Sequence, residues 1–339
     1  MTTVYLHIGM PKTGTTSLQH FLSNNQEKLL EKGYLYPKSG RISKDRNITI
    51  CTNYHHGLAK ALLKIYDSKA PWANQDVWEG SLKDLKIEIK TIKAANIIIY
   101  SEAFTGRQEF YNPDLIALTK TMLEEYDTKV IIYVRRQDEF IRSFYCEHIK
   151  NMALDKKNLR NFILEWTKRI NYYKLLEPWK KSFGIQNVIV RPFEKEQMKN
   201  SSLFEDFLEN IHLNHINPNE SNFNFSSSMS KNTSYSGKVI KLIDLIEETS
   251  QIRRLIKLLQ KSKKYWYLYE RYGFLRRGIN LRIKLAIYMS RFIPDFLISE
   301  ELISTKDRVS IMKECEESNQ KVAKEYLGRE DGKLFYSKP

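Results

Sequence analysis

The sequence predicts an α/β protein in which a parallel sheet is flanked by helices. Short apolar runs rich in β-branched residues alternate with longer segments of helical spacing, a pattern that favours a parallel sheet over a β-sandwich. We expect strands at 3–8, 96–100, 129–134 and 187–191. From about residue 195 helical segments and polar linkers predominate, which predicts a helical C-terminal part.

Helices are expected between and after these strands because apolar residues recur there every three or four positions. They are predicted at 15–32, 58–65, 81–94, 114–126, 140–152, 158–166, 170–183, 237–248 and 304–327. A short extended piece is expected at 34–37. Polar stretches predict loops at 39–53, 71–80 and 217–233.

Composition predicts a folded protein, with 339 residues, 42% of them hydrophobic and 12% aromatic. Three scattered cysteines are too few for a disulfide framework or a zinc site, so a reducing compartment fits best. We see neither an export signal nor about 18 uninterrupted apolar residues. We therefore expect a cytoplasmic protein, in part at the inner face of the membrane.

The net charge of +15 is concentrated in one segment. Residues 251–291 contain twelve Lys and Arg against one acid, which predicts an anionic partner such as a phospholipid surface, an acidic glycan or nucleic acid. The aromatic and basic run 263–277 is either a helix packed on the core or a surface for a glycan or a lipid. We divide the chain into a core (1–250), a basic aromatic-rich insertion (251–303) and a C-terminal helix and tail (304–339).

The first strand, a glycine turn and the first helix form a phosphate-binding layout. Gly9 and Gly14 let the backbone approach an anion, and the helix N-terminus directs free N–H groups at it. Lys12 adds a positive charge, and hydroxyl donors come from Thr13, Thr15, Thr16 and Ser17. The loop is not a Walker A motif, because Thr15 occupies the lysine position.

The run PKTGTTSLQ at 11–19 resembles the 5′-phosphosulfate loop of sulfotransferases that use 3′-phosphoadenosine 5′-phosphosulfate (PAPS). That loop has the form [PK]K[ST]GTT. The resemblance implies that Lys12 stabilises the leaving group. It also implies that the 5′-phosphate is held by Pro11, Lys12, Thr13, Gly14, Thr15, Thr16 and Ser17.

A second run, RRQDEFIRS at 135–143, resembles the 3′-phosphate signature of the same family. Arg135 follows a strand, and Ser143 comes eight residues later. A guanidinium fork and a hydroxyl suit a phosphate dianion, and so select PAPS over ATP. The alternative is a basic strand end paired with Asp138 or Glu139.

The resemblance covers most of 3–250 and 304–335, and it points to bacterial sulfotransferases found with glycan-synthesis genes. It implies a P-loop-like sulfotransferase fold, PAPS as co-substrate, 3′-phosphoadenosine 5′-phosphate (PAP) as product and no metal. The implied acceptor is a hydroxyl, less readily an amine, of a carbohydrate or glycolipid. Lys231 and Asn232 stand where family members close a loop over the nucleotide.

Sulfuryl transfer needs a general base, and three residues compete for that role. Glu102 ends the strand before Arg135, where glycan-directed relatives keep a glutamate, and burial can raise the pKa of such a carboxyl. His56 and His55 compete because imidazole titrates near neutral pH. Glu102 could instead cap the following helix. His7, in the first strand, is expected to be a satisfied core histidine.

Two other function classes remain as rivals. A P-loop kinase of small molecules would require Mg·ATP, and the displaced lysine argues against it. A nucleic-acid-binding protein would use the basic segment and bind with steep salt dependence, but this reading leaves Lys12, Arg135 and Ser143 unexplained, so we expect no nucleic acid. Intact Lys12 also argues against a fold that binds the nucleotide without catalysis.

Overall fold

The computed structural model describes residues 2–45, 48–66, 80–105, 112–150, 159–213, 223–224, 236–249, 284–294 and 301–339. The chain forms two compact units, each built from separate stretches of sequence. Unit 1 contains Met1–Arg136, Ile170–Lys231 and Cys315–Lys338. Unit 2 contains Gln137–Arg169, Asn232–Glu314 and Pro339.

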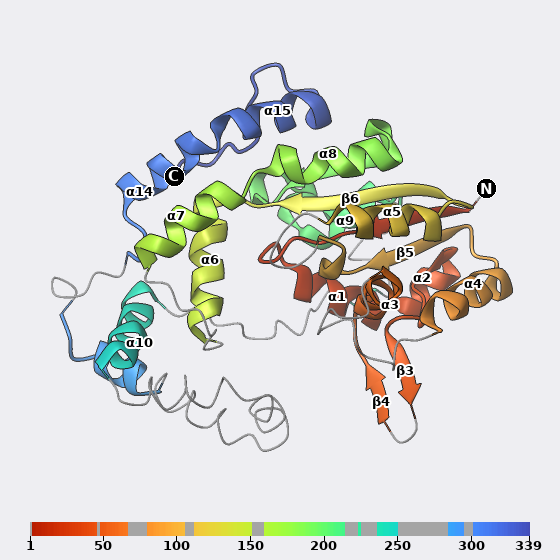
Figure 1. The fold of residues 1–339 in the computed structure, drawn as a ribbon, viewed down its shortest axis with the longest axis horizontal. Coiled ribbons are helices and arrows are strands. Elements are labelled where there is room, and N and C mark those ends of the chain that lie inside the picture. Colours follow the sequence, from red (N-terminus) through yellow and green to blue (C-terminus); the bar gives the residue numbers. More distant parts are fainter. Residues whose placement is uncertain are drawn as a thin grey trace. The chain divides into compact units, whose positions relative to one another are not determined.

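Unit 1 is organised around a parallel sheet of five strands in the order β2-β5-β1-β6-β7. Figure 1 labels two of these strands, β5 and β6. The strands are β1 (Thr3–His7), β2 (Tyr34–Leu35), β5 (Asn96–Tyr100), β6 (Asp127–Val134) and β7 (Val188–Pro192). All four neighbouring pairs are parallel, which confirms the predicted α/β class. The apolar β-branched runs form these strands because both faces of the sheet are covered.

The strand order reverses at β1, and this reversal fixes where a site can form. The chain goes from β1 to β2 and β5 on one side of β1, and then crosses to β6 and β7 on the other. His7 at the end of β1 is in register with Tyr100 of β5 and Ile131 of β6. In open α/β sheets, ligands bind outside the carboxyl ends of the strands at such a switch point.

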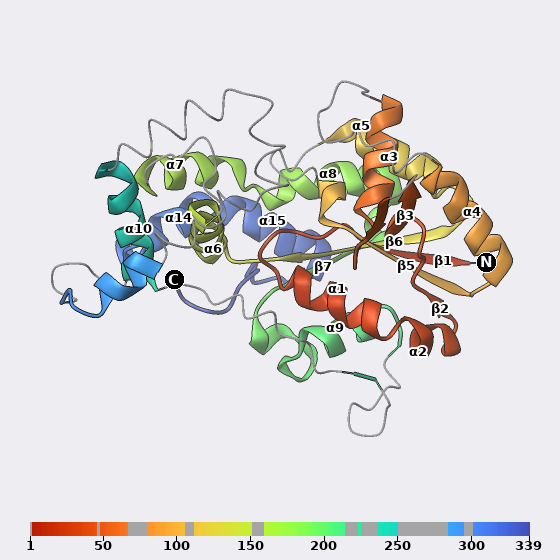
Figure 2. The ribbon, with the colours of Figure 1, turned by 90° about the horizontal axis from the view of Figure 1, so that it is seen from below.

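Helices cover both faces of the sheet (Figure 2). One face carries α1 (Thr15–Asn24), α2 (Gln26–Glu31) and α9 (Leu203–Asn210). The other carries α3 (His56–Tyr66), α5 (Pro113–Met122) and α8 (Tyr172–Phe183), with α4 (Ser81–Ile92) against α3 and α15 (Glu316–Leu327) against α8. Leu18, Phe21 and Leu22 give α1 an apolar stripe that packs in the core against the aromatic side chains of the sheet.

Two long helices that we expected are each divided in two. The segment 15–32 breaks at Asn25, whose side-chain amide donates to the carbonyl of Phe21 at 2.8 Å and to that of Asn224 at 3.1 Å. By bonding a carbonyl at the end of α1, this amide competes with the backbone hydrogen bonds that would continue the helix. The segment 304–327 breaks at Cys315, between α14 (Thr305–Glu314) and α15.

The expectation of a loop at 39–53 is wrong. This stretch contains an antiparallel hairpin of β3 (Ile42–Asp45) and β4 (Ile48–Cys51). Its second strand reads ITIC, three of whose four residues are β-branched and favour extended backbone. The polar residues around it outweighed this signal in the sequence.

Unit 2 is helical over its described residues. It contains α6 (Gln137–Lys150), α7 (Leu159–Arg169), α10 (Gly237–Thr249), α14 and a helical stretch at 284–290. Aromatic rings from α6 and α7 pack together, with Phe144 and Trp166 centroids 4.7 Å apart. Arg308 of α14 bonds the carboxylates of Asp138 and Glu139, each at 2.7 Å. These are the two acids considered as partners for the basic end of β6.

Among the helices that the structure describes, none combines the length and apolar character required of a membrane span. Most of the basic segment, residues 251–283, lies outside the described residues, as does most of the expected loops at 71–80 and 217–233.

A candidate active site at the carboxyl edge of the sheet

The loop after β1 has three residues in the left-handed backbone region. Gly9 has φ 59°, Lys12 has φ 68° and Gly14 has φ 72°. A lysine rarely adopts such a φ, and strained positions of this kind are concentrated at functional sites. The hydroxyl of Thr13 donates to the carbonyl of Met10 at 2.7 Å and closes the turn.

The loop leads directly into the N-terminus of α1. Gly14 is the N-cap residue, no side chain caps the helix, and its first turn contains no acid. The first N–H groups of a helix have no partner within the helix, and the helix dipole makes this end attractive to an anion. Thr15 is buried, whereas Thr16 is exposed at the same end. These features of the loop and of the start of α1 are compatible with the predicted anion site.

Close packing explains both glycines of the loop. A Cβ on Gly9 would lie 3.0 Å from Cγ and 3.1 Å from Cα of Glu102, so the loop and the residue after β5 approach each other closely. A Cβ on Gly14 would lie 2.5 Å from Cδ2 of Leu203 and 3.1 Å from the Phe193 ring. The loop is thus enclosed by residues that follow β5 and β7.

Arg135 reaches the same loop from the end of β6. Its Nη1 donates to the backbone carbonyl of Lys12 at 3.0 Å. Its guanidinium lies 5.8 Å from the centroid of the Phe193 ring, within the range of a cation–π contact. The hydroxyl of Tyr172 donates to the Arg135 carbonyl. Arg135, the first residue of the second predicted motif, therefore contacts the loop of the first predicted motif at the Lys12 carbonyl.

The three candidate bases have different environments. Both nitrogens of His55 bond to backbone: Nδ1 accepts the Tyr100 N–H at 3.0 Å, and Nε2 lies 3.0 Å from the Pro37 carbonyl. Burial, and then the nearby Arg41 charge, lower the pKa of His55 to about 3. Its contacts hold β5 to the segment after β2, which is a structural role.

His56 begins α3 and lies against the end of β5. Its Nδ1 is 2.6 Å from the hydroxyl oxygen of Ser101, which also accepts the Ala103 N–H at 3.1 Å. A hydroxyl that accepts from Ala103 still has its own proton to donate to Nδ1, and in that arrangement the imidazole proton sits on Nε2. Ser101 is fully buried and therefore orients this ring.

The remaining predicted residues are divided between the units and the undescribed segments. Ser143 is on α6 in unit 2, whereas Arg135 is in unit 1, so their pairing stays a prediction. Lys231 and Asn232 lie outside the described residues. Sequence reasoning missed Phe193 and Ser101. Both directly follow strands. Ligands bind beyond the carboxyl ends of parallel strands, so considering the residue after every strand would have selected both.

His7 differs from the expected satisfied core histidine. It is buried, but neither ring nitrogen has a hydrogen-bond partner. The ring stacks on Tyr100 with centroids 4.1 Å apart and planes 7° apart. Burial lowers the pKa of His7 to about 3, so the ring is neutral. Aromatic stacking, rather than hydrogen bonding, holds this histidine in the core.

Comparison with known proteins leaves the family open. No family model and no solved structure matches the sequence. A protein of Archaeoglobus fulgidus described as uncharacterized is 23% identical over 235 residues, which cover 68% of this chain and 54% of that protein. The chain thus spans about half the length of the curated relative it matches.

Proposed function

We propose that the protein is a PAPS-dependent sulfotransferase with the P-loop-like sulfotransferase fold, acting on a carbohydrate or glycolipid. The observation that carries the proposal is the hydrogen bond from Arg135 to the Lys12 carbonyl. It joins an anion-binding helix N-terminus to a guanidinium from the neighbouring strand. A nucleotide with phosphates on both its 5′ and 3′ positions fits two such anion sites.

The residues of the loop have separate roles in this reaction. The α1 N-terminus, with the Thr16 and Ser17 hydroxyls, binds the 5′-phosphate. Lys12 stabilises the negative charge that develops on the leaving phosphate oxygen. Arg135 binds the 3′-phosphate. When bound, the co-substrate supplies the sulfuryl group, and the displacement leaves PAP.

Glu102 is the residue we assign as general base. It is the second residue after β5, and its Cα and Cγ approach the first loop glycine closely, so its carboxylate would lie beside the proposed anion site. His56 is the alternative, oriented by Ser101. His55 is the weakest of the three, because backbone groups occupy both of its ring nitrogens.

The partners follow from the same reaction. The acceptor is a hydroxyl of a bacterial carbohydrate or glycolipid, in keeping with polysaccharide biosynthesis. The segment 251–291 would then contact a membrane surface or an anionic glycan, since it contains twelve Lys and Arg and one acid. A cytoplasmic protein working at the inner membrane face would meet such acceptors.

Calorimetric titration with PAP and, separately, with Mg·ATP tests the donor. We expect the protein to bind PAP and to respond little to Mg·ATP. Arg135→Ala should weaken PAP binding about 10- to 100-fold, the range expected for loss of charge-assisted hydrogen bonds to a phosphate. Lys12→Ala should also weaken it, because the loop loses its positive charge.

Lys32→Ala is the matched control, since it removes an exposed lysine in unit 1 at the far end of α2 from the loop. Its PAP affinity should equal that of the wild type. A protein that bound Mg·ATP and ignored the 3′-phosphate would be the kinase instead, and the sulfotransferase proposal would be wrong.

A further inference from the structure

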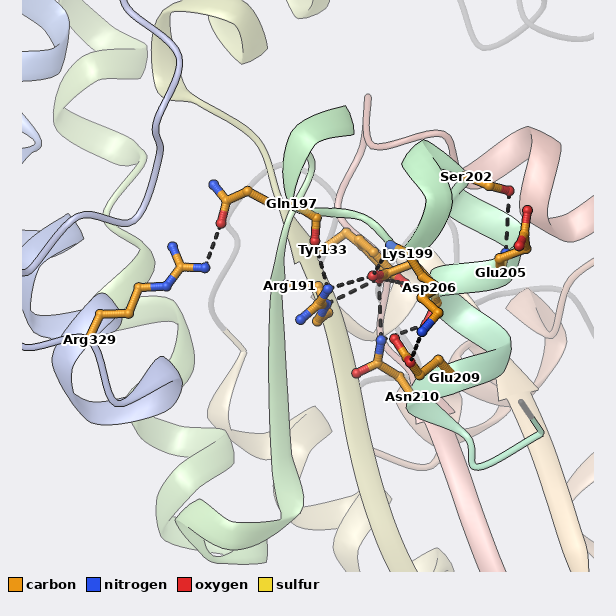
Figure 3. Close-up of polar contacts among 10 residues, drawn as sticks. All are labelled: Tyr133, Arg191, Gln197, Lys199, Ser202, Glu205, Asp206, Glu209, Asn210 and Arg329. Carbon is orange, nitrogen blue, oxygen red and sulfur yellow. Dashed lines mark hydrogen bonds and ion pairs between the residues drawn. The ribbon is translucent and has the colours of Figure 1, made fainter. Parts of the chain in front are cut away.

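The segment 333–338 follows α15 and is bonded to the residues just after β7. The Glu194 carboxylate accepts the backbone N–H groups of Tyr336 at 2.9 Å and of Ser337 at 3.2 Å. Gln197 donates from Nε2 to the Leu334 carbonyl at 3.1 Å. Figure 3 shows the adjoining contact, in which Arg329 donates to Gln197 Oε1 at 2.6 Å. The segment is therefore bonded to the rest of unit 1 at several points.

One side chain of this segment connects two buried charges. The Ser337 hydroxyl donates to Glu194 Oε1 and accepts from Arg136 Nη1, the latter at 3.0 Å. Arg136 also donates to the Lys338 carbonyl. Glu194 and Arg136 are only 7% and 8% exposed, so each needs partners to offset the cost of leaving water. Ser337 provides one partner to each of them.

The two residues that Ser337 connects are direct neighbours of two residues at the candidate site. Arg136 follows Arg135 at the end of β6, and Glu194 follows Phe193 at the end of β7. The strands pair up to this point, since the Phe193 N–H donates to the Val134 carbonyl at 2.7 Å. Just after this last backbone bond, Ser337 links the residues that follow β6 and β7 through its bonds to Arg136 and Glu194. Arg135 and Phe193, in turn, contact the loop after β1, at Lys12 and Gly14 respectively.

We propose that Ser337 is a positioning residue for the 3′-phosphate of the donor. By joining Arg136 to Glu194, it fixes the backbone that carries Arg135, so that the guanidinium stays over the Phe193 ring and against the Lys12 carbonyl. Ser337 itself does not bind the nucleotide. The proposal rests on the proposed function, because it assigns the 3′-phosphate to Arg135.

The test compares the affinities of Ser337→Ala for PAP and for adenosine 5′-monophosphate, which lacks the 3′-phosphate. We expect the PAP affinity to fall at least fivefold, while the monophosphate affinity stays within twofold of the wild type. Ser337→Thr keeps the hydroxyl and should retain wild-type PAP affinity. In an Arg135→Ala background, Ser337→Ala should cause no further loss, because its effect passes through Arg135.

Lys333→Ala is the control, because it changes an exposed side chain of the same segment and should leave both affinities unchanged. Glu194→Gln weakens the hydrogen bond that the Ser337 hydroxyl donates to residue 194. It should also lower the affinity for PAP and not that for the monophosphate, and it provides a second test if Ser337→Ala folds poorly. Equal losses for both nucleotides, or no loss, would overturn the inference. A wild-type protein that bound no PAP would overturn the proposed function instead.

Discussion

At the scale of single residues, Glu102 and His56 are the two main candidates for the general base of the proposed reaction. Glu102 lies against Gly9 in the loop after β1, whereas His56 is hydrogen-bonded to buried Ser101. A carboxylate beside the loop can take a proton from an acceptor hydroxyl. A histidine whose Nδ1 accepts from serine has its other nitrogen protonated and is a poor base in that tautomer.

We therefore predict that Glu102→Gln lowers turnover by at least about 100-fold, the usual contribution of a general base. The measurement is the release of labelled sulfate from ³⁵S-PAPS with water as the acceptor. PAP affinity should be retained, which separates loss of the base from loss of the donor site.

His56→Asn is the comparison variant for this experiment. It should reduce turnover less than Glu102→Gln, because the ring positions the end of β5 rather than accepting the proton. A reversed ranking, with His56→Asn near zero and Glu102→Gln active, would assign the base to His56.

At the scale of elements, α9 is fixed to the sheet by one buried carboxylate. Asp206 is fully buried, accepts the Tyr133 hydroxyl at 2.7 Å and bonds Arg191 through Nε at 3.1 Å and Nη2 at 2.5 Å (Figure 3). The backbone N–H of Lys199 adds a bond at 3.1 Å. These bonds hold α9 in place, and its first residue, Leu203, packs against Gly14 of the loop after β1.

Asp206→Ala should lower the free energy of unfolding by about 3–5 kcal/mol, because it leaves the partly buried Arg191 charge without its partner. The measurement is urea denaturation followed by circular dichroism. A loss below about 1 kcal/mol would mean that water satisfies Arg191 without Asp206.

Glu209→Gln on the same helix is the matched control. Glu209 pairs with Lys199 at 3.0 Å, but their side chains are 40% and 50% exposed. Exposed pairs contribute at most about 1 kcal/mol, so the free energy of unfolding should change little.

The elements also show what the sequence could predict. Five-residue β5 was predicted at its observed bounds, because a short apolar run between polar residues is an unambiguous signal. Arg135 was predicted at the end of its strand for the same reason. Ser337 and Asp206 could not be found this way, since their roles depend on partners 201 and 73 residues away in the chain. The β3–β4 hairpin was missed because apolar and polar residues alternate only in its second strand, ITIC, and not in its first, ISKD.

At the scale of the whole molecule, two buried neutral histidines make the fold sensitive to acid. The pKa values of His7 and His55 are both lowered to about 3, whereas an unfolded histidine titrates near 6.5. Below about pH 6.5 the unfolded chain therefore binds protons that the folded chain does not, and stability falls as the pH falls towards 3. Each histidine contributes a loss of about 2 kcal/mol between pH 7 and pH 5.

His7→Phe should remove one of these contributions and keep the stack on Tyr100. Between pH 7 and pH 5 the free energy of unfolding should fall for both proteins, and the fall should be about 2 kcal/mol smaller for the variant than for the wild type. The measurement is urea denaturation at each pH. His212→Asn is a control at an exposed position with φ 60°, which asparagine tolerates, and should follow the wild type. Parallel curves for His7→Phe and the wild type would contradict the assignment.

The interleaving of the two units has a consequence for biosynthesis. Residues 315–338 belong to unit 1 but emerge from the ribosome after all of Gln137–Arg169 and Asn232–Glu314. While these intervening stretches are being made, α15 is not yet present to pack against α8 and β7. The hydrogen bonds of Ser337 to Arg136 and Glu194 are also still missing. A chaperone that shields exposed apolar surface would act on the chain during this interval. The connection of β6 to β7 through Ser337 therefore forms only after both of these stretches have been synthesised.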